Sequence, residues 1–262
     1  MLTFFIIYLL CGMCTGFLAG LFGIGGGILL IPVLLALFSM QNMPETLSMH
    51  MAIGTSLATI IIASSSSVLT YYRKGDLLLP LVKQCAPGSV IGSIVGVFIA
   101  NHIHNIYLER IFSGLLFIVA LDLFFRIEPT TKIATPNGKI LFGAAALFGI
   151  LGGMLGIGGG IFIIPFFQWC GFSIRHSIAA ASACILSVAM VGTIGYMIFG
   201  AQLSDLPRFS TGYIYWPAFF GIGLTSAIAA PLGVRVAHAI STRVLKRLFA
   251  VFLMLVAIKM LI

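Results

Sequence analysis

The stretch GFLAGLFGIGGGILLIP, at residues 16–32, decides the fold of this chain, because it recurs as GILGGMLGIGGGIFIIP at residues 149–165. Every glycine of the first copy has a glycine in the second, and Pro32 corresponds to Pro165. A spaced match of this kind indicates an internal duplication. The sequence therefore predicts a single transmembrane domain, residues 1–262, with one repeat at about 1–126 and a second at about 139–262.

The composition places both repeats in a lipid bilayer. Hydrophobic residues make up 60% of the 262 residues and charged residues only 8%, whereas a soluble domain has about 25% charged residues. Long apolar runs without strict alternation predict helices rather than a barrel, so we expect an all-α polytopic membrane protein. The net charge of +8 is interpreted as an orientation signal, and no nucleic-acid partner is expected.

Apolar runs broken by polar, proline or glycine residues predict five helical segments in each half. The expected segments are, by residue number, about 2–22, 28–40, 46–72, 80–100 and 107–125, then about 140–155, 161–171, 175–199, 211–235 and 243–261. At about 1.5 Å per residue, segments 28–40 and 161–171 cover roughly half to two-thirds of a bilayer, and they either span it fully or re-enter.

Charge placement bears on whether each glycine-rich break reverses the chain or only kinks a helix. If the breaks reverse it, Arg110, Arg208 and Lys259 lie on one side of the membrane and every other Lys and Arg lies on the opposite side. If the breaks are kinks, the basic residues divide almost evenly. Cytoplasmic loops are enriched in Lys and Arg, so the uneven division favours reversal. Five segments per half make the repeats inverted, as in many secondary transporters, and put both termini outside.

The two glycine-rich breaks form the first candidate site. Glycines inside a membrane segment free backbone N–H groups that need a partner at that depth. If Ile28 and Ile161 begin new half-helices, their N–H groups and positive dipole ends provide an anion site without formal charge. The alternative is that the glycines allow close helix packing. The residues expected to hold an anion through their backbone are Gly25, Gly26, Gly27, Ile28, Gly158, Gly159, Gly160 and Ile161.

The segment after each break carries the second candidate set. The hydroxyls of Thr55, Ser56 and Ser182 are expected to add contacts to an anion. His50 and His176 recur at equivalent places in the two halves, which suggests a proton relay or gate. The alternatives are that a histidine near the membrane surface caps a neighbouring helix and that hydroxyls bond to a carbonyl one turn back, bending the helix.

Nothing in the chain suits an enzyme. The sequence has no H-E-x-x-H, no G-x-S-x-G elbow and no paired-carboxylate arrangement. It also has no Walker motif, so ATP does not drive transport from this chain alone. No cofactor and no bound metal are expected.

The doubled glycine motif and the stretch HMAIGTSL, at residues 50–57, together resemble the sulfite exporter TauE/SafE family of membrane permeases. The resemblance covers essentially the whole chain. It implies a secondary transporter, in the export direction, for small sulfur-containing anions such as sulfite or organosulfonates across the cell inner (plasma) membrane. Either H⁺ or Na⁺ is the coupling ion implied, unless transport is simple facilitation.

The second half departs from the family pattern. Ala180-Ala181-Ser182 stands where a second Gly-Thr-Ser is expected, so the two half-sites are not expected to bind equivalently. Two other functions stay open at this point. One is a cation or metal permease, for which only His50 and His176 qualify as ligands, and the other is a membrane scaffold without flux.

Overall fold

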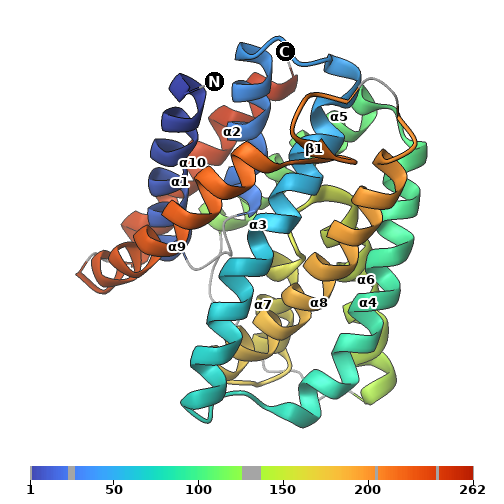
Figure 1. Ribbon diagram of the computed structural model, residues 1–262. Helices are drawn as coiled ribbons and strands as arrows, with labels where there is room; N and C mark the ends of the chain where they lie inside the picture. Colours follow the sequence, from blue (N-terminus) through green and yellow to red (C-terminus); the bar gives the residue numbers. More distant parts are fainter. Residues whose placement is uncertain (1, 23–26, 126–136, 204–205, 240–241, 262) are drawn as a thin grey trace.

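The computed structural model describes residues 2–22, 27–125, 137–203, 206–239 and 242–261. These residues form ten helices and one two-stranded antiparallel hairpin (Figure 1). In chain order the elements are α1 (Leu2–Phe22), α2 (Gly27–Met40), α3 (Glu45–Arg73), α4 (Leu79–His102), α5 (Asn105–Phe125), α6 (Gly138–Leu155), α7 (Gly160–Trp169), α8 (Ile174–Gly200), β1 (Ser210–Thr211), β2 (Ile214–Tyr215), α9 (Trp216–Ala239) and α10 (Thr242–Leu261).

The helices confirm the predicted all-α fold and its segments, with one correction. The segment expected at 211–235 begins too early, because β1 and β2 form a hairpin there and α9 starts only at Trp216. Phe209 and Gly212 have φ of 67° and 56°, left-handed conformations that turn the chain away from a helix. The aromatic residues of this stretch also favour a strand.

The described part of the chain is that of a multi-pass membrane protein. α3, α4, α6 and α8 are long and apolar enough to cross a membrane by length and composition. Shorter apolar stretches lie in α1, α2, α7, α9 and α10. Helices are the element expected here, because a helix satisfies its backbone hydrogen bonds internally in lipid.

The chain reverses direction between α6 and α7. α7 has only 10 residues, which cover about 15 Å, or half of a bilayer core. The ring of Phe148 in α6 stacks on that of Phe162, with centroids 5.8 Å apart, and lies 5.7 Å from that of Phe166, one turn further along α7. The two helices therefore lie side by side, and the chain turns back at the second break, which agrees with reversal rather than a kink.

The two halves have equivalent packing partners. α1 packs along α9, and α6, the first helix of the second half, packs along α4. α3 packs against α8, and α5 against α10. Glycine allows the close approach, since a Cβ on Gly16 would collide with the backbone of Ser226 in α9 and one on Gly92 with the carbonyl of Ala146 in α6. Helix packing is thus one role of the glycines, and the inverted relation of the repeats stays a prediction.

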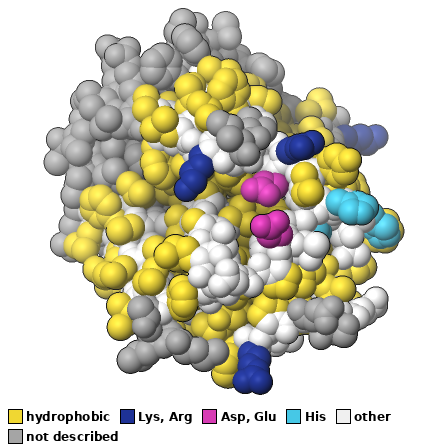
Figure 2. Space-filling view, turned by 90° about the horizontal axis from the view of Figure 1, so that it is seen from above, with side chains coloured by type: hydrophobic (Ala, Val, Ile, Leu, Met, Phe, Trp, Pro, Cys, Tyr) yellow, Lys and Arg dark blue, Asp and Glu magenta, His cyan; other side chains and the backbone are white. Residues whose placement is uncertain are grey.

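Both termini lie at the same end of the molecule, beside the hairpin (Figure 1). Arg110, early in α5, and Lys259, late in α10, belong to this end. Lys83, Lys139 and Arg175 lie near the starts of α4, α6 and α8, and these helices begin at the opposite end (Figure 1). Figure 2 shows the terminal end from above, with acidic side chains near the middle of the face and basic ones around them.

Candidate functional site

The second glycine-rich break, residues 156–160, is buried. Gly156, Gly158 and Gly159 have φ of 68°, 73° and 80°, a conformation that a residue with a Cβ rarely adopts. The amides of Gly156 and Gly158 both donate to the carbonyl oxygen of Gly152, the latter over 3.3 Å, and so end α6. The break therefore requires glycine for its backbone conformation.

α7 begins at Gly160 without a side chain to cap its N-terminus. Gly159 occupies the N-cap position, and its carbonyl accepts from the amides of Phe162 and Ile163 at 3.1 Å each. The N–H groups of Gly160 and Ile161 belong to the first turn of this helix, where the backbone carries partial positive charge. Because Gly160 is buried, this charge lies inside the protein.

The first break meets the second at Gly27. Gly27 and Ile28 begin α2, and both are buried. A Cβ on Gly27 would lie 2.9 Å from the carbonyl oxygen of Gly156 and 2.7 Å from Cδ1 of Ile60. Only glycine therefore lets the two breaks come this close. Two of the predicted anion-binding residues lie outside the described residues: Gly25 and Gly26.

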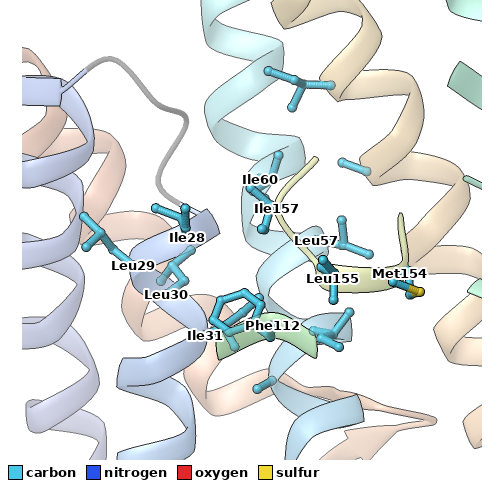
Figure 3. Packing of buried hydrophobic residues seen from close by; sticks show 14 of the residues in the cluster. Ile28, Leu29, Leu30, Ile31, Leu57, Ile60, Phe112, Met154, Leu155 and Ile157 are labelled. Carbon is cyan, nitrogen blue, oxygen red and sulfur yellow. The ribbon is translucent and has the colours of Figure 1, made fainter. Parts of the chain in front are cut away.

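Apolar side chains surround the place where the breaks meet. Figure 3 shows Ile28 at the start of α2, Ile157 in the second break and Ile60 of α3 beside Ile157. The exposed fraction of each is 2% or less. Electrostatic interactions are stronger in such a low-dielectric interior than in water, so the uncapped helix start of α7 has more effect here than at a surface.

α3 brings two of the predicted hydroxyls to the centre. Ser56 donates its hydroxyl hydrogen to the carbonyl oxygen of Gly156 over 2.9 Å. The neighbouring Thr55 accepts at its Oγ1 from the amide of Tyr215, 3.0 Å away. Both side chains are fully buried. The structure thus places Ser56 on the second break and Thr55 against the hairpin.

The equivalent residues of the second half make local hydrogen bonds. Ser182 donates to the carbonyl of Ile178, one turn back in α8, over 2.8 Å. The backbone amide of His176 donates to the hydroxyl of Ser173, which caps α8. The alternative of local helix bonding therefore describes Ser182, and the equivalent hydroxyls of the two halves have different hydrogen-bond partners.

His50 joins three helices and the hairpin. Its Nε2 lies 3.0 Å from the carbonyl oxygen of Ala100 in α4, and its Nδ1 lies 3.3 Å from Oδ1 of Asn105 in α5. That Oδ1 already accepts from the amide of Met49, so both ring nitrogens face acceptors. The ring stacks on Tyr213, with centroids 5.1 Å apart. The contacts of His50 are therefore with α4, α5 and the hairpin rather than with the breaks.

Metal-ligating side chains are dispersed in the described part of the chain, where no group of three or more His, Cys, Asp or Glu residues could hold a metal ion. Cys85 and Cys184 are buried free thiols in contact with each other. His50 and His176, the ligands considered for a cation permease, belong to different helices and have separate partners.

Sequence reasoning missed the hairpin, whose Tyr213 and Tyr215 are almost fully buried. Gly212 favours a turn, and the β-branched and aromatic side chains of Ile214 and Tyr215 after it favour a strand. This turn-and-strand pattern was the available signal. Whether these residues form a hairpin depends on the side chains packed against them, and the tertiary structure determines that packing.

In comparisons with protein families and with known proteins, the sequence is similar to membrane transporters. The sequence profile of the sulfite exporter TauE/SafE family matches residues 8–260. A probable membrane transporter protein of Haemophilus influenzae is 36% identical over 99% of both chains. The probable membrane transporter protein MJ0441 of Methanocaldococcus jannaschii is 26% identical, over 92% of this chain and 89% of its own. No solved structure matches.

Proposed function

The chain belongs to the sulfite exporter TauE/SafE family, and on that premise we propose that it is a secondary transporter that exports small sulfur-containing anions across the inner membrane. Sulfite and organosulfonates are the substrate class proposed. The family and the relatives named as membrane transporters support transport as such. The sulfur anion, the direction and the inner membrane are our proposal.

The observation that carries the proposal is the meeting of the two breaks at Gly27 and Gly156. A small anion at this place would receive N–H groups from residues 27–28 and 159–161 and the positive ends of two half-helices. The amide of Gly158, also predicted to contribute, already donates to the carbonyl of Gly152. Discontinuous helices that point their N-termini at an anionic substrate near the bilayer midplane are a recurring transporter design. Such a site needs no buried Lys or Arg, whose charge would be costly at that depth.

The hydroxyls near the breaks then act as secondary contacts. A hydroxyl has one hydrogen to donate, and those of Ser56 and Ser182 go to the carbonyls of Gly156 and Ile178. We propose that an anion competes with these carbonyls, so that Ser56 and Ser182 rotate toward it when it binds. Thr55 accepts from the hairpin and keeps its own hydrogen for donation.

His50 is the proposed proton-sensitive gate residue, with His176 in the equivalent position of the second half. A neutral imidazole donates one hydrogen, whereas a protonated one donates two. Both ring nitrogens of His50 face acceptors, on Ala100 and Asn105. Protonation therefore tightens the junction of α3, α4 and α5, and it also favours the stack on Tyr213. This supports H⁺ over Na⁺ as the coupling ion.

Alternating access would come from one repeat moving against the other around the fixed breaks. The test is flux of labelled sulfite and of a short alkyl sulfonate in proteoliposomes of the purified protein. We expect saturable flux of at least one of them, increased by a proton gradient of one polarity. Absence of saturable flux for every sulfur anion would overturn the proposal. Flux of a divalent cation instead would favour the cation permease, and no flux of either class would favour a scaffold.

A further inference from the structure

The connection between α8 and α9 is unlike its counterpart in the first half. Residues 201–215 lie between these helices, whereas only residues 74–78 connect α3 to α4. The longer connection contains the hairpin, in which Ser210 pairs with Tyr215 and Thr211 with Ile214. The amide of Trp216 donates to the carbonyl of Phe209 and closes its base. Figure 1 shows it at the terminal end of the molecule, alongside α3.

The hairpin is attached to both halves of the protein. The amide of Tyr213 donates to the carbonyl oxygen of Tyr196 in α8 over 3.2 Å. The amide of Tyr215 donates to Thr55 in α3. The hairpin also lies directly on the α3 backbone, since a Cβ on Gly54 would lie 2.9 Å from the carbonyl oxygen of Tyr213. Any movement of α3 relative to α8 must therefore strain or release these two amide hydrogen bonds.

The two hairpin tyrosines complete an aromatic layer across the interior. The ring of Tyr215 lies 6.1 Å from that of Tyr8 in α1 and 5.8 Å from that of Phe38 in α2. The ring of Tyr213 lies 6.1 Å from that of Tyr196 and stacks on His50. Aromatic pairs of this kind are tightly packed and exclude water.

This layer lies between the glycine breaks and the terminal end. α3 begins at that end, and His50 of the layer precedes Ser56, which bonds to the second break. Six residues of helix separate His50 from Ser56, or about 9 Å along the axis. An anion at the breaks that moved toward the terminal end alongside α3 would meet Tyr213 and Tyr215 first.

We propose that the hairpin Ser210–Tyr215 is the gate that closes the anion site on the side of the chain termini. It opens when the amides of Tyr213 and Tyr215 release α8 and α3, and the two tyrosines leave the aromatic layer together. The gate closes one side only, because the equivalent connection in the first half, residues 74–78 between α3 and α4, is short. The inference rests on the proposed anion site at the breaks, but its test does not depend on the substrate.

The test measures access to Ser56 from the terminal side. Ser56→Cys is labelled in sealed vesicles of known orientation with a membrane-impermeant methanethiosulfonate, and labelling is followed on the peptide that contains position 56. Two changes weaken the closed gate: Thr55→Val removes the acceptor of Tyr215, and Gly54→Ala places a methyl group against Tyr213. The matched controls are Thr55→Ser, which keeps the hydroxyl, and Gly114→Ala, where a Cβ meets open space.

We expect Thr55→Val to label about fivefold to tenfold faster than Thr55→Ser from the terminal side, as the loss of one buried hydrogen bond implies. Labelling from the other side should not change. Thr55→Val and Gly54→Ala are first shown to elute and to melt like their controls. The proposal is overturned if position 56 is then labelled no faster in these two variants than in Thr55→Ser and Gly114→Ala. Faster labelling without flux of any sulfur anion leaves the gate in place and refutes the substrate, so the two failures are distinguishable.

Discussion

Ser56 of the first half donates its hydroxyl hydrogen to the carbonyl oxygen of Gly156 in the second half, over 2.9 Å. Both residues are buried. Ser56 lies in the stretch HMAIGTSL of the first half, and Gly156 lies in the glycine-rich stretch of the second half. This bond connects α3 to the break that ends α6, so a movement of one half acts directly on the backbone of the other.

Removing this bond should weaken the fold and the transporter together. Ser56→Ala leaves the Gly156 carbonyl unpaired in the interior, which costs about 1–3 kcal/mol. Ser182→Ala is the matched control, because its hydroxyl bonds only within α8 and its loss should change stability much less. Thermal unfolding in detergent measures the difference. Equal destabilisation by the two substitutions would contradict the proposed role of the inter-half bond.

Separating the two breaks should strongly reduce transport without unfolding the protein. Gly27→Ala places a methyl group against the carbonyl of Gly156, in a helical residue whose backbone accepts alanine. We expect sulfur-anion flux to fall at least about tenfold, because the N–H groups lose their convergence on one anion. Gly143→Ala, where the Cβ meets nothing within 4 Å, should transport normally. Full flux in Gly27→Ala would remove the breaks as the site.

Replacing the break glycine that has a left-handed backbone should act more severely. Gly159→Val forces a β-branched residue to adopt φ of 80° and brings its Cβ to 2.8 Å from the carbonyl oxygen of Phe148. We expect the protein to insert in the membrane and lose transport, since the distortion is local to α6 and α7. Flux and membrane-fraction abundance are measured together, and normal flux at normal abundance would refute the prediction.

His50 should confer a pH dependence that His102 does not. The His50 ring faces acceptors on α4 and α5, whereas the exposed His102 ring bonds within its own helix, to Phe98. In His50→Gln we expect flux to lose most of its dependence on pH, because the imidazole is the group that gains or loses a proton there. His102→Gln should keep the wild-type profile. An unchanged profile in His50→Gln would assign the proton response to another group.

The hairpin should open at high pH. Burial raises the pKa of Tyr213 and of Tyr215 above the ordinary value of 10.0. The closed hairpin therefore favours the neutral phenols: its stabilisation is complete below that value and is lost as the pH rises through the raised pKa values. Tyrosinate absorbance measures this, and Tyr213→Phe together with Tyr215→Phe should remove part of the late-titrating signal. An unchanged titration would show that these phenols ionise elsewhere in the curve.

The sequence by itself determined the elements, the duplication and the kind of protein. Apolar runs punctuated by glycine and proline predict the helices, because a bilayer requires long apolar segments with internally bonded backbones. The repeated glycines of residues 16–32 and 149–165 indicate the positions of both breaks. The expectation was wrong at residues 211–215, where tertiary contacts rather than local hydrophobicity select a hairpin.

Only the tertiary structure decided which of these residues meet. Gly27 and Gly156 touch although they are far apart in the chain, and no local pattern encodes that contact. The direction of a hydroxyl hydrogen is likewise set by whichever carbonyl is left unpaired nearby. Ser56 therefore reaches across to Gly156, whereas Ser182, at the equivalent place, bonds back to Ile178. Repeated sequence determines where the breaks fall, and packing between the halves determines which neighbours each break finds.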